Sequence, residues 1–192
     1  MAYIELEDLK GYLDISITED NPLIQEAIKA AQKFIEDQTH RVFEATTATK
    51  YYDRAALDDH NSTILHLDDD CLTVTELLNG DADATEITSD YYWLLHRNLG
   101  PPYRAIQLTT NDGYYWQWGV DCWVEVTGTW GYTATPDSSI KEATKVLASF
   151  YYRAKDSQVF ETTAIPEAGV ITIPQGVPTR IKNILESHAK NI

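Results

Sequence analysis

The period of the hydrophobic pattern changes twice along this chain, and that change limits the fold more than any single motif does. Residues 22–38 have the apolar spacing of an amphipathic helix, with Asn21 as the expected cap and Pro22 as the first helical residue. Between about residues 45 and 132, β-branched and aromatic runs alternate with turn residues. Residues 136–154 return to helical spacing. We therefore expect an α+β fold, in which a β-rich insert lies between two amphipathic helices that form a helical core.

Shorter elements are expected at both ends of the chain. A weak apolar pattern predicts a short helix at residues 5–13. Residues 156–177 are rich in Ser, Thr, Pro and Gly, contain one extended run at 170–173, and predict a C-terminal arm. A terminal helix is expected after Pro178. The predicted organisation is one domain at 1–155, followed by an arm and terminal helix at 156–192.

The insert is expected to form a sheet that ends near residue 132. The Asn79-Gly80 pair between two β-prone runs predicts a hairpin turn. Turn residues separate the remaining runs. The predicted strands lie near residues 48–53, 62–67, 72–78, 86–95, 103–109 and 114–127.

The charge balance limits the partners of the chain. The sequence has 15 Lys and Arg residues against 30 Asp and Glu residues, a formal net charge of −15. Broad affinity for nucleic-acid phosphates or anionic membranes needs clustered cations, so neither is expected. The N-terminus is acidic where a secretory signal is basic, and no apolar run approaches the roughly 20 residues of a membrane span. We therefore expect no membrane partner and assembly in the cytoplasm.

Motifs that mark common enzyme classes are absent from the sequence. It has no nucleophile elbow, no phosphate-binding Gly-Lys loop, no dinucleotide-binding Gly motif and no His-Glu-x-x-His zinc motif. The five histidines are not paired at helical spacing, and Cys71 and Cys122 lie far apart, which favours neither a zinc site nor a disulfide. We expect no catalytic residues, no cofactor and no metal ligands.

Three acidic clusters are the remaining candidates for cation binding. They lie at residues 58–59, at residues 68–70, and at Asp81 with Asp83. The segment that begins at Asp81 opens like a calcium-binding loop, but Glu86 occupies the position where such a loop needs a tight-turn Gly. Acidic runs of this kind are typical of solvated loops, and we interpret all three clusters in this way.

Aromatic residues are the most distinctive feature of the insert. Strand alternation would divide their rings between the two faces of the sheet. One face can form the core, while rings on the other face would suit a partner surface. The residues that we assign to such a subunit or tail-side interface are Trp116, Trp118, Trp123 and Trp130.

Two parts of the sequence resemble a known family. Residues 4–13 read Ile-Glu-Leu-Glu-Asp-Leu-Lys-Gly-Tyr-Leu and precede an Asp-Asn-Pro start to an Ala-rich helix that ends in Phe-Ile-Glu at 34–36. Residues 124–132 read Val-Glu-Val-Thr-Gly-Thr-Trp-Gly-Tyr, and Pro136 and a second helix follow them. In order and spacing these features resemble the head-tail connector and head-completion proteins of long-tailed bacteriophages. The resemblance covers the first 40 residues and about 124–155.

The resemblance implies a structural virion protein located in the neck. Such proteins form a ring, commonly of twelve copies, that docks beneath the portal protein and receives a stopper or tail-completion protein on its other side. DNA passes through the ring without specific binding, and an acidic lumen would let it slide. On this basis we expect the terminal helix to bind the portal through the narrow stripe Ile181, Ile184, Leu185 and His188.

Two other classes of function remain open from the residues alone. Exposed Trp and Tyr rings would also suit a carbohydrate-binding or receptor-binding β module, although such a module does not need two long amphipathic helices. A hydrolase that uses a pair of carboxylates is compatible with the many acidic residues, but the sequence indicates no particular pair.

Overall fold

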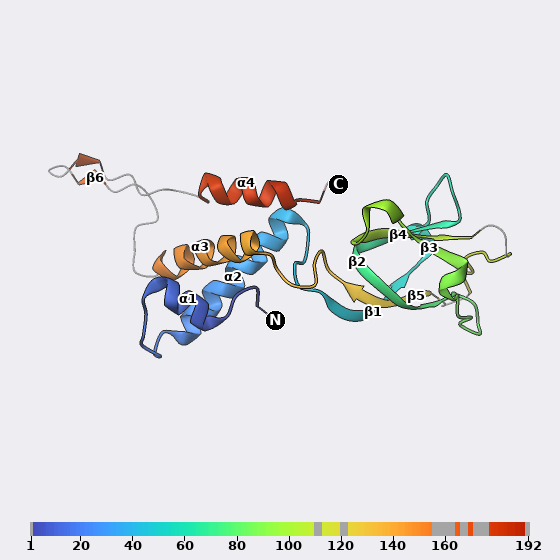
Figure 1. The fold of residues 1–192 in the computed structure, drawn as a ribbon, viewed down its shortest axis with the longest axis horizontal. Coiled ribbons are helices and arrows are strands. Elements are labelled where there is room, and N and C mark those ends of the chain that lie inside the picture. Colours follow the sequence, from blue (N-terminus) through green and yellow to red (C-terminus); the bar gives the residue numbers. More distant parts are fainter. Residues whose placement is uncertain are drawn as a thin grey trace. The chain divides into compact units, whose positions relative to one another are not determined.

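The computed structural model describes residues 2–109, 113–119, 123–154 and 177–190, together with the backbone of two short strands at 164–165 and 169–170. The chain divides into two compact units. The helical unit comprises residues 1–40 and 136–192, and the β unit comprises residues 41–135. Helices and an antiparallel sheet are both present (Figure 1), so the predicted α+β class is confirmed.

The helical unit begins with α1, Leu6–Leu13, and α2, Asn21–Thr39. Glu5 and Asp8 close a reciprocal capping box at the start of α1. Asp20 occupies the N-cap position of α2, so Asn21 is the first helical residue and not the expected cap. Pro22 follows in the first turn, where a missing N–H removes no helical hydrogen bond.

α3, Ser138–Ala154, packs along α2. The Tyr152 hydroxyl donates a hydrogen bond to the Asp20 carboxylate, so the end of α3 lies at the start of α2 and the two helices are antiparallel. Phe150, an apolar residue in the last turns of α3, is 45% exposed. The residues that α2 and α3 bury are small or aliphatic on both helices, namely Ile24, Ala27, Ile28, Ala31, Ile35, Thr39, Ile140, Ala143, Thr144, Leu147 and Ala148.

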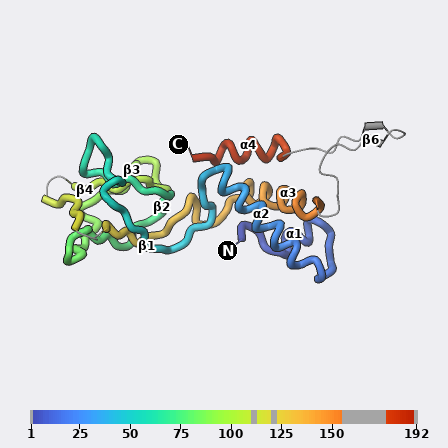
Figure 2. Tube along the Cα trace, turned by 180° about the vertical axis from the view of Figure 1, so that it is seen from behind, coloured from blue at the N-terminus to red at the C-terminus, as the bar shows by residue number. Residues whose placement is uncertain are grey.

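The terminal helix α4, Thr179–His188, lies beside α2 and α3 in both views (Figures 1 and 2). The Lys190 N–H donates to the Thr39 carbonyl at 2.8 Å, which anchors the end of this segment at the end of α2. The structure thus groups α4 with the earlier helices in one unit, whereas the sequence predicted a division at residue 155.

The β unit contains a five-stranded antiparallel sheet in the order β1-β5-β2-β4-β3. β2 is central and long, and it pairs with β4 through its first half and with β5 through its second. A separate two-stranded sheet joins β6 to β7. The strands are β1 Thr46–Tyr52, β2 Ile64–Leu78, β3 Tyr92–Leu95, β4 Tyr103–Leu108, β5 Val124–Trp130, β6 Ala164–Ile165 and β7 Gly169–Val170.

Several predicted strands have different bounds in the structure. The runs at 62–67 and 72–78 are one strand, β2, which continues through register shifts between His66 and Cys71 and again beyond Cys71. The run at 86–95 is a strand only from Tyr92 onward. Of the run at 114–127, residues 124–127 belong to β5, and the described residues 114–119 belong to no named strand. Of the predicted extended run at 170–173, residue 170 belongs to β7 and the rest lies outside the described residues.

Residues 113–119, which we call the aromatic loop, belong to no named strand and are held by side-chain bonds and by one isolated parallel bridge between Trp118 and Gly80. The Trp116 indole N–H donates to the Thr63 carbonyl at 3.0 Å. The Gly119 N–H donates to the Gly80 carbonyl at 2.6 Å. The loop therefore covers the sheet core without joining the ladder.

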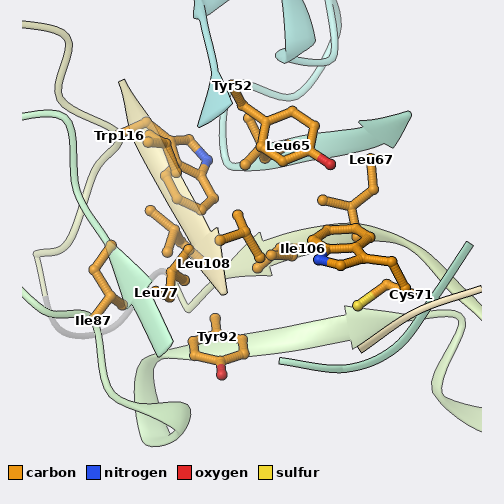
Figure 3. Close-up of a cluster of buried hydrophobic side chains, with 13 residues drawn as sticks. Tyr52, Leu65, Leu67, Cys71, Leu77, Ile87, Tyr92, Ile106, Leu108 and Trp116 are labelled. Atoms are coloured by element: carbon orange, nitrogen blue, oxygen red, sulfur yellow. The ribbon is translucent and has the colours of Figure 1, made fainter. Parts of the chain in front are cut away.

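The core of the β unit combines aliphatic and aromatic side chains from all five strands and the aromatic loop (Figure 3). Leu65, Leu77, Ile106 and Leu108 are fully or almost fully buried at its centre. Gly128 permits the close approach of β5 to β2, because a Cβ at this position would lie 2.2 Å from the Thr73 carbonyl oxygen.

Candidate functional site

A buried carboxylate holds two arginines in the β unit. Asp70 is 4% exposed and accepts hydrogen bonds from Arg41 Nη1 and from Arg104 Nε, each at 3.2 Å. The Arg41 guanidinium also lies 4.0 Å from the centre of the Tyr132 ring. We call Arg41, Asp70 and Arg104 the arginine clamp. The interpretation of residues 68–70 as a solvated loop is wrong, because all three residues lie in β2. Asp68 and Asp69 are exposed there, whereas Asp70 is buried between two cations.

The arginine clamp lies where the chain enters and leaves the β unit. The Gly131 N–H donates to the Asp70 carbonyl at 2.7 Å, and the Tyr132 N–H donates to the Val42 carbonyl at 2.6 Å. The rings of Phe43 and Tyr132 meet edge to face, with their centroids 5.5 Å apart. The first and last segments of the unit are thus bonded to each other as well as to the sheet.

Asn79 organises the aromatic loop. It is 3% exposed, its Oδ1 accepts from the Gln117 N–H at 2.9 Å, and its Nδ2 donates to the Tyr115 carbonyl at 3.1 Å. The Asn79 N–H donates to the Thr85 carbonyl at 2.8 Å, so the reversal of direction occurs after the Asn79-Gly80 pair. The prediction of a tight turn at this pair is wrong, because the amide side chain is used for long-range bonds.

The four tryptophans that we assigned to an interface have different environments. Trp116 and Trp130 are 6% and 4% exposed, and the Trp130 indole N–H donates to the Ala48 carbonyl at 2.8 Å. Trp118 is half-buried, and Trp123 is 49% exposed. Trp116 and Trp130 therefore contribute to the core of the β unit, while Trp118 and Trp123 retain accessible surface.

The predicted portal-binding stripe of α4 faces the protein's own helices. Ile181 and Leu185 are 1% and 5% exposed, whereas Ile184 and His188 are half-buried. At the other end of this contact, Arg180 and Glu142 form an exposed ion pair at 2.9 Å. An exposed pair of this kind stabilises a helix contact by at most about 1 kcal/mol. The burial of two aliphatic side chains is thus the main force that holds α4 in place.

The end of α4 is bonded to the cap of α3. His188 Nε2 lies 3.1 Å from an Asp137 carboxylate oxygen, while the other carboxylate oxygen accepts from the Ile140 N–H at 2.9 Å. Burial alone would raise the pKa of Asp137. The hydrogen bonds from the Ile140 N–H, the Ser139 hydroxyl and His188 outweigh burial, and the pKa of Asp137 is lowered.

Comparison with known proteins shows the family of the chain. Residues 2–191 match the family model described as head completion protein. The chain belongs to the head completion protein family. Membership makes it a structural bacteriophage protein and not an enzyme.

Two solved structures share the fold of this head completion family member. A chain described as the neck of an empty gene transfer agent particle, computed with C6 symmetry, is 16% identical with a TM-score of 0.61. A chain from the virion of a native gene transfer agent particle is 14% identical with a TM-score of 0.65. In each case the similarity covers 99% of this chain and 91% of the other. No curated protein matches the chain.

The surface of this head completion family member has a hollow beside β3. The hollow is wide open, has a volume of about 480 Å³, and is lined by residues that include Asp90, Trp93, Arg97 and Tyr103. The Arg97 guanidinium already lies over the Trp93 ring, 4.8 Å from its centre. One face of the Trp93 ring is therefore already occupied by a guanidinium, which reduces the ring surface available for stacking on a sugar.

Within the described ranges, no group of three or more His, Cys, Asp or Glu side chains is arranged to hold a metal ion. Nor does any helix in those ranges combine the length and the apolar character that crossing a bilayer requires. The features that remain for function are surfaces on the two units.

Proposed function

We propose that the protein is a head-tail connector, which forms a ring in the virion neck beneath the portal and joins the DNA-filled capsid to the tail. The observation that carries this proposal is the match of residues 2–191 to the head completion family. It is supported by the fold shared with a chain from the neck of a gene transfer agent particle. That neck was computed with C6 symmetry, and a ring of twelve copies is compatible with sixfold averaging.

A closed ring needs two different complementary faces on every copy. Each unit of this protein exposes large apolar side chains that could contribute to such faces. In the helical unit these are Tyr12, Ile17, Leu23 and Phe150, and in the β unit they are Val42, Tyr51, Trp93, Leu99, Tyr115 and Trp123.

The portal is the proposed partner of α4. Because Ile181 and Leu185 are buried against the protein's own helices, binding through them requires α4 to leave α2 and α3. The helix has only ten residues, and its ion pairs with Glu142 and Asp137 are partly exposed. It is therefore energetically feasible for α4 to leave the groove on its own helices and bind an apolar groove on the portal. Removal of residues 178–192 should abolish portal binding.

The tail-side partner, a stopper or tail-completion protein, is assigned to the surface near Trp118 and Trp123. These two tryptophans keep accessible ring surface, and aromatic side chains of this kind are enriched at protein interfaces. DNA is expected to pass through the lumen without specific contacts, because the chain carries a formal net charge of −15. A basic lumen in the assembled ring would contradict this part of the proposal.

The test is the mass of the purified protein alone and mixed with the portal protein, measured by light scattering and followed by negative-stain imaging. Rings, alone or on the portal, support the connector function. A monomer that ignores the portal but changes its Trp fluorescence on titration with polysaccharide would favour a carbohydrate-binding module instead.

A matched pair of variants tests the role of α4 within the same experiment. Ile184→Asp places a charge on the proposed portal-binding stripe at a half-buried position, and Asn183→Asp places the same charge on the exposed face. We expect the first variant to lose portal binding and the second to retain it. Equal binding by both would refute the assignment of α4 to the portal.

A further inference from the structure

The outer edge of β1 is an open strand edge. Within the described part of the chain, β1 pairs with β5 alone and forms one end of the sheet. Its seven residues run in unbroken register with β5, from Thr46 opposite Trp130 to Tyr52 opposite Val124. The backbone groups of alternate residues on the other side of β1 are therefore directed away from the sheet.

This edge lacks the features that usually protect an edge strand. Natural edges carry charged residues, Pro or bulges that prevent pairing with another chain. Residues 46–49 read Thr-Thr-Ala-Thr, are all exposed, and contain neither a charge nor Pro. Lys50 follows, but its ammonium group pairs with Asp69 and lies over the Trp130 ring. The opposite edge strand, β3, has only four residues.

An uncharged segment that would suit this uncharged strand edge lies between α3 and α4. Residues 168–176 read Ala-Gly-Val-Ile-Thr-Ile-Pro-Gln-Gly and carry no charge in a chain whose formal net charge is −15. Its β-branched run favours an extended strand. The strand that begins here, β7, pairs with β6 through only two residues in each strand. A two-stranded sheet is marginally stable by itself and is stabilised by joining a larger sheet.

We propose that the outer edge of β1 binds segment 168–176 of a second copy of this chain, which extends the five-stranded sheet by one strand. The proposal rests on the proposed ring and identifies one of its contacts between copies. The contact is made by main-chain N–H and C=O groups, and it repeats head to tail because the edge and the segment are different surfaces. Pro174 ends the pairing, since it lacks an N–H.

The chain on either side of the segment sets how far it can reach. Ala168 lies fourteen residues after Ala154, the end of α3, and these residues span up to about 46 Å when extended. Because pairing ends at Pro174, the link to α4 is the six residues from Ile173 to Thr179, and they span up to about 20 Å. The contact therefore requires the β1 edge of the adjacent copy to lie within about 20 Å of the start of α4.

The first test is cross-linking between two different copies of the full chain. In a Cys122→Ser background, chains with Thr47→Cys are mixed with chains with Thr172→Cys, assembled with the portal protein and treated with a bifunctional maleimide. The expected product is a covalent dimer that contains one chain of each kind. Rings without this dimer would overturn the inference and leave the connector function standing.

The second test removes one main-chain donor from the segment. Ile171→Pro should raise the protein concentration needed for ring formation about tenfold, whereas Ser157→Pro, placed before the segment, should leave it unchanged. Equal effects of the two substitutions would overturn the inference. A chain that carries both Thr47→Cys and Thr172→Cys and cross-links only within itself would also overturn the inference. Failure of the parent protein to form rings with the portal would refute the connector function and the inference together.

Discussion

Replacement of Asp70 by Asn should destabilise the β unit far more than the same change at its neighbour Asp69. Asp70 is 4% exposed and faces Arg41, whose side chain is 9% exposed. Loss of the carboxylate leaves a buried guanidinium without a counter-charge, and Arg41 Nε is already buried without a hydrogen-bond partner.

The size of this effect follows from the exposure of the two arginines. Removal of one partner from a buried ion pair costs about 3–5 kcal/mol. The lower end applies here, because the Arg104 side chain is 37% exposed and regains water when the carboxylate is lost. We therefore expect Asp70→Asn to cost about 3 kcal/mol, which lowers the melting temperature of a unit of this size by more than about 10 °C. Asp69→Asn breaks an exposed pair with Lys50 and should cost at most about 1 kcal/mol.

Tryptophan fluorescence provides the assay, because all five tryptophans lie between residues 41 and 135 and so report on the β unit. Thermal and urea unfolding of the three proteins should separate Asp70→Asn from the parent and from Asp69→Asn. A double variant, Arg41→Met with Asp70→Leu, should recover most of the lost stability, since it removes both charges together. Equal losses from Asp70→Asn and Asp69→Asn would refute the reasoning.

Three further outcomes are expected. Gly128→Ala should cost about 3 kcal/mol in urea unfolding because its Cβ would meet the Thr73 carbonyl, whereas Gly11→Ala in α1, with open space around it, should gain about 0.5–1 kcal/mol. Burial raises the pKa of Cys71 to about 11, so mass spectrometry should find it unmodified by thiol reagents at pH 8 until the β unit unfolds. Because the folded-state pKa of Asp137 is lowered, the stability that Asp137 contributes is present above its ordinary pKa of 3.8 and is lost as the pH falls below that value. Asp137→Asn should lack this acid-induced loss when the helices are followed by circular dichroism.

Each of these outcomes has a result that contradicts it. An unchanged free energy of unfolding in Gly128→Ala would show that β5 and β2 can move apart without a loss of stability. Rapid labelling of Cys71 in the folded protein would show that its thiol is accessible. An unchanged acid transition in Asp137→Asn would show that other carboxylates control the stability of the helices at low pH.

The helices were predictable because their signals are local. The stripes of α2 and α3, and Pro22 near the start of α2, depend on neighbours within one or two turns of the same helix. The α+β class followed from the change in hydrophobic period. Exposure of Phe150 at the end of α3 was not predictable, since it depends on which other elements cover that turn.

The sheet was harder to predict because its pairing joins residues that are far apart in the sequence. Residues 68–70 have the composition of a loop, yet β2 continues through them because Asp70 meets Arg41 and Arg104 from distant segments. The Asn79-Gly80 pair has the composition of a turn, yet Asn79 bonds to the aromatic loop nearly forty residues later. Nothing local distinguishes these residues from ordinary loop residues.

The sequence by itself determined the order of helical and β-rich segments and the similarity to head-completion proteins, because both depend on patterns of neighbouring residues. The tertiary structure decided which side chains became surface. It buried Trp116 and Trp130, placed Ile181 and Leu185 against α2 and α3, and left residues 46–49 as an open edge. The physical reason is that burial and strand pairing are properties of contacts between distant segments, and these contacts form only when the chain is folded.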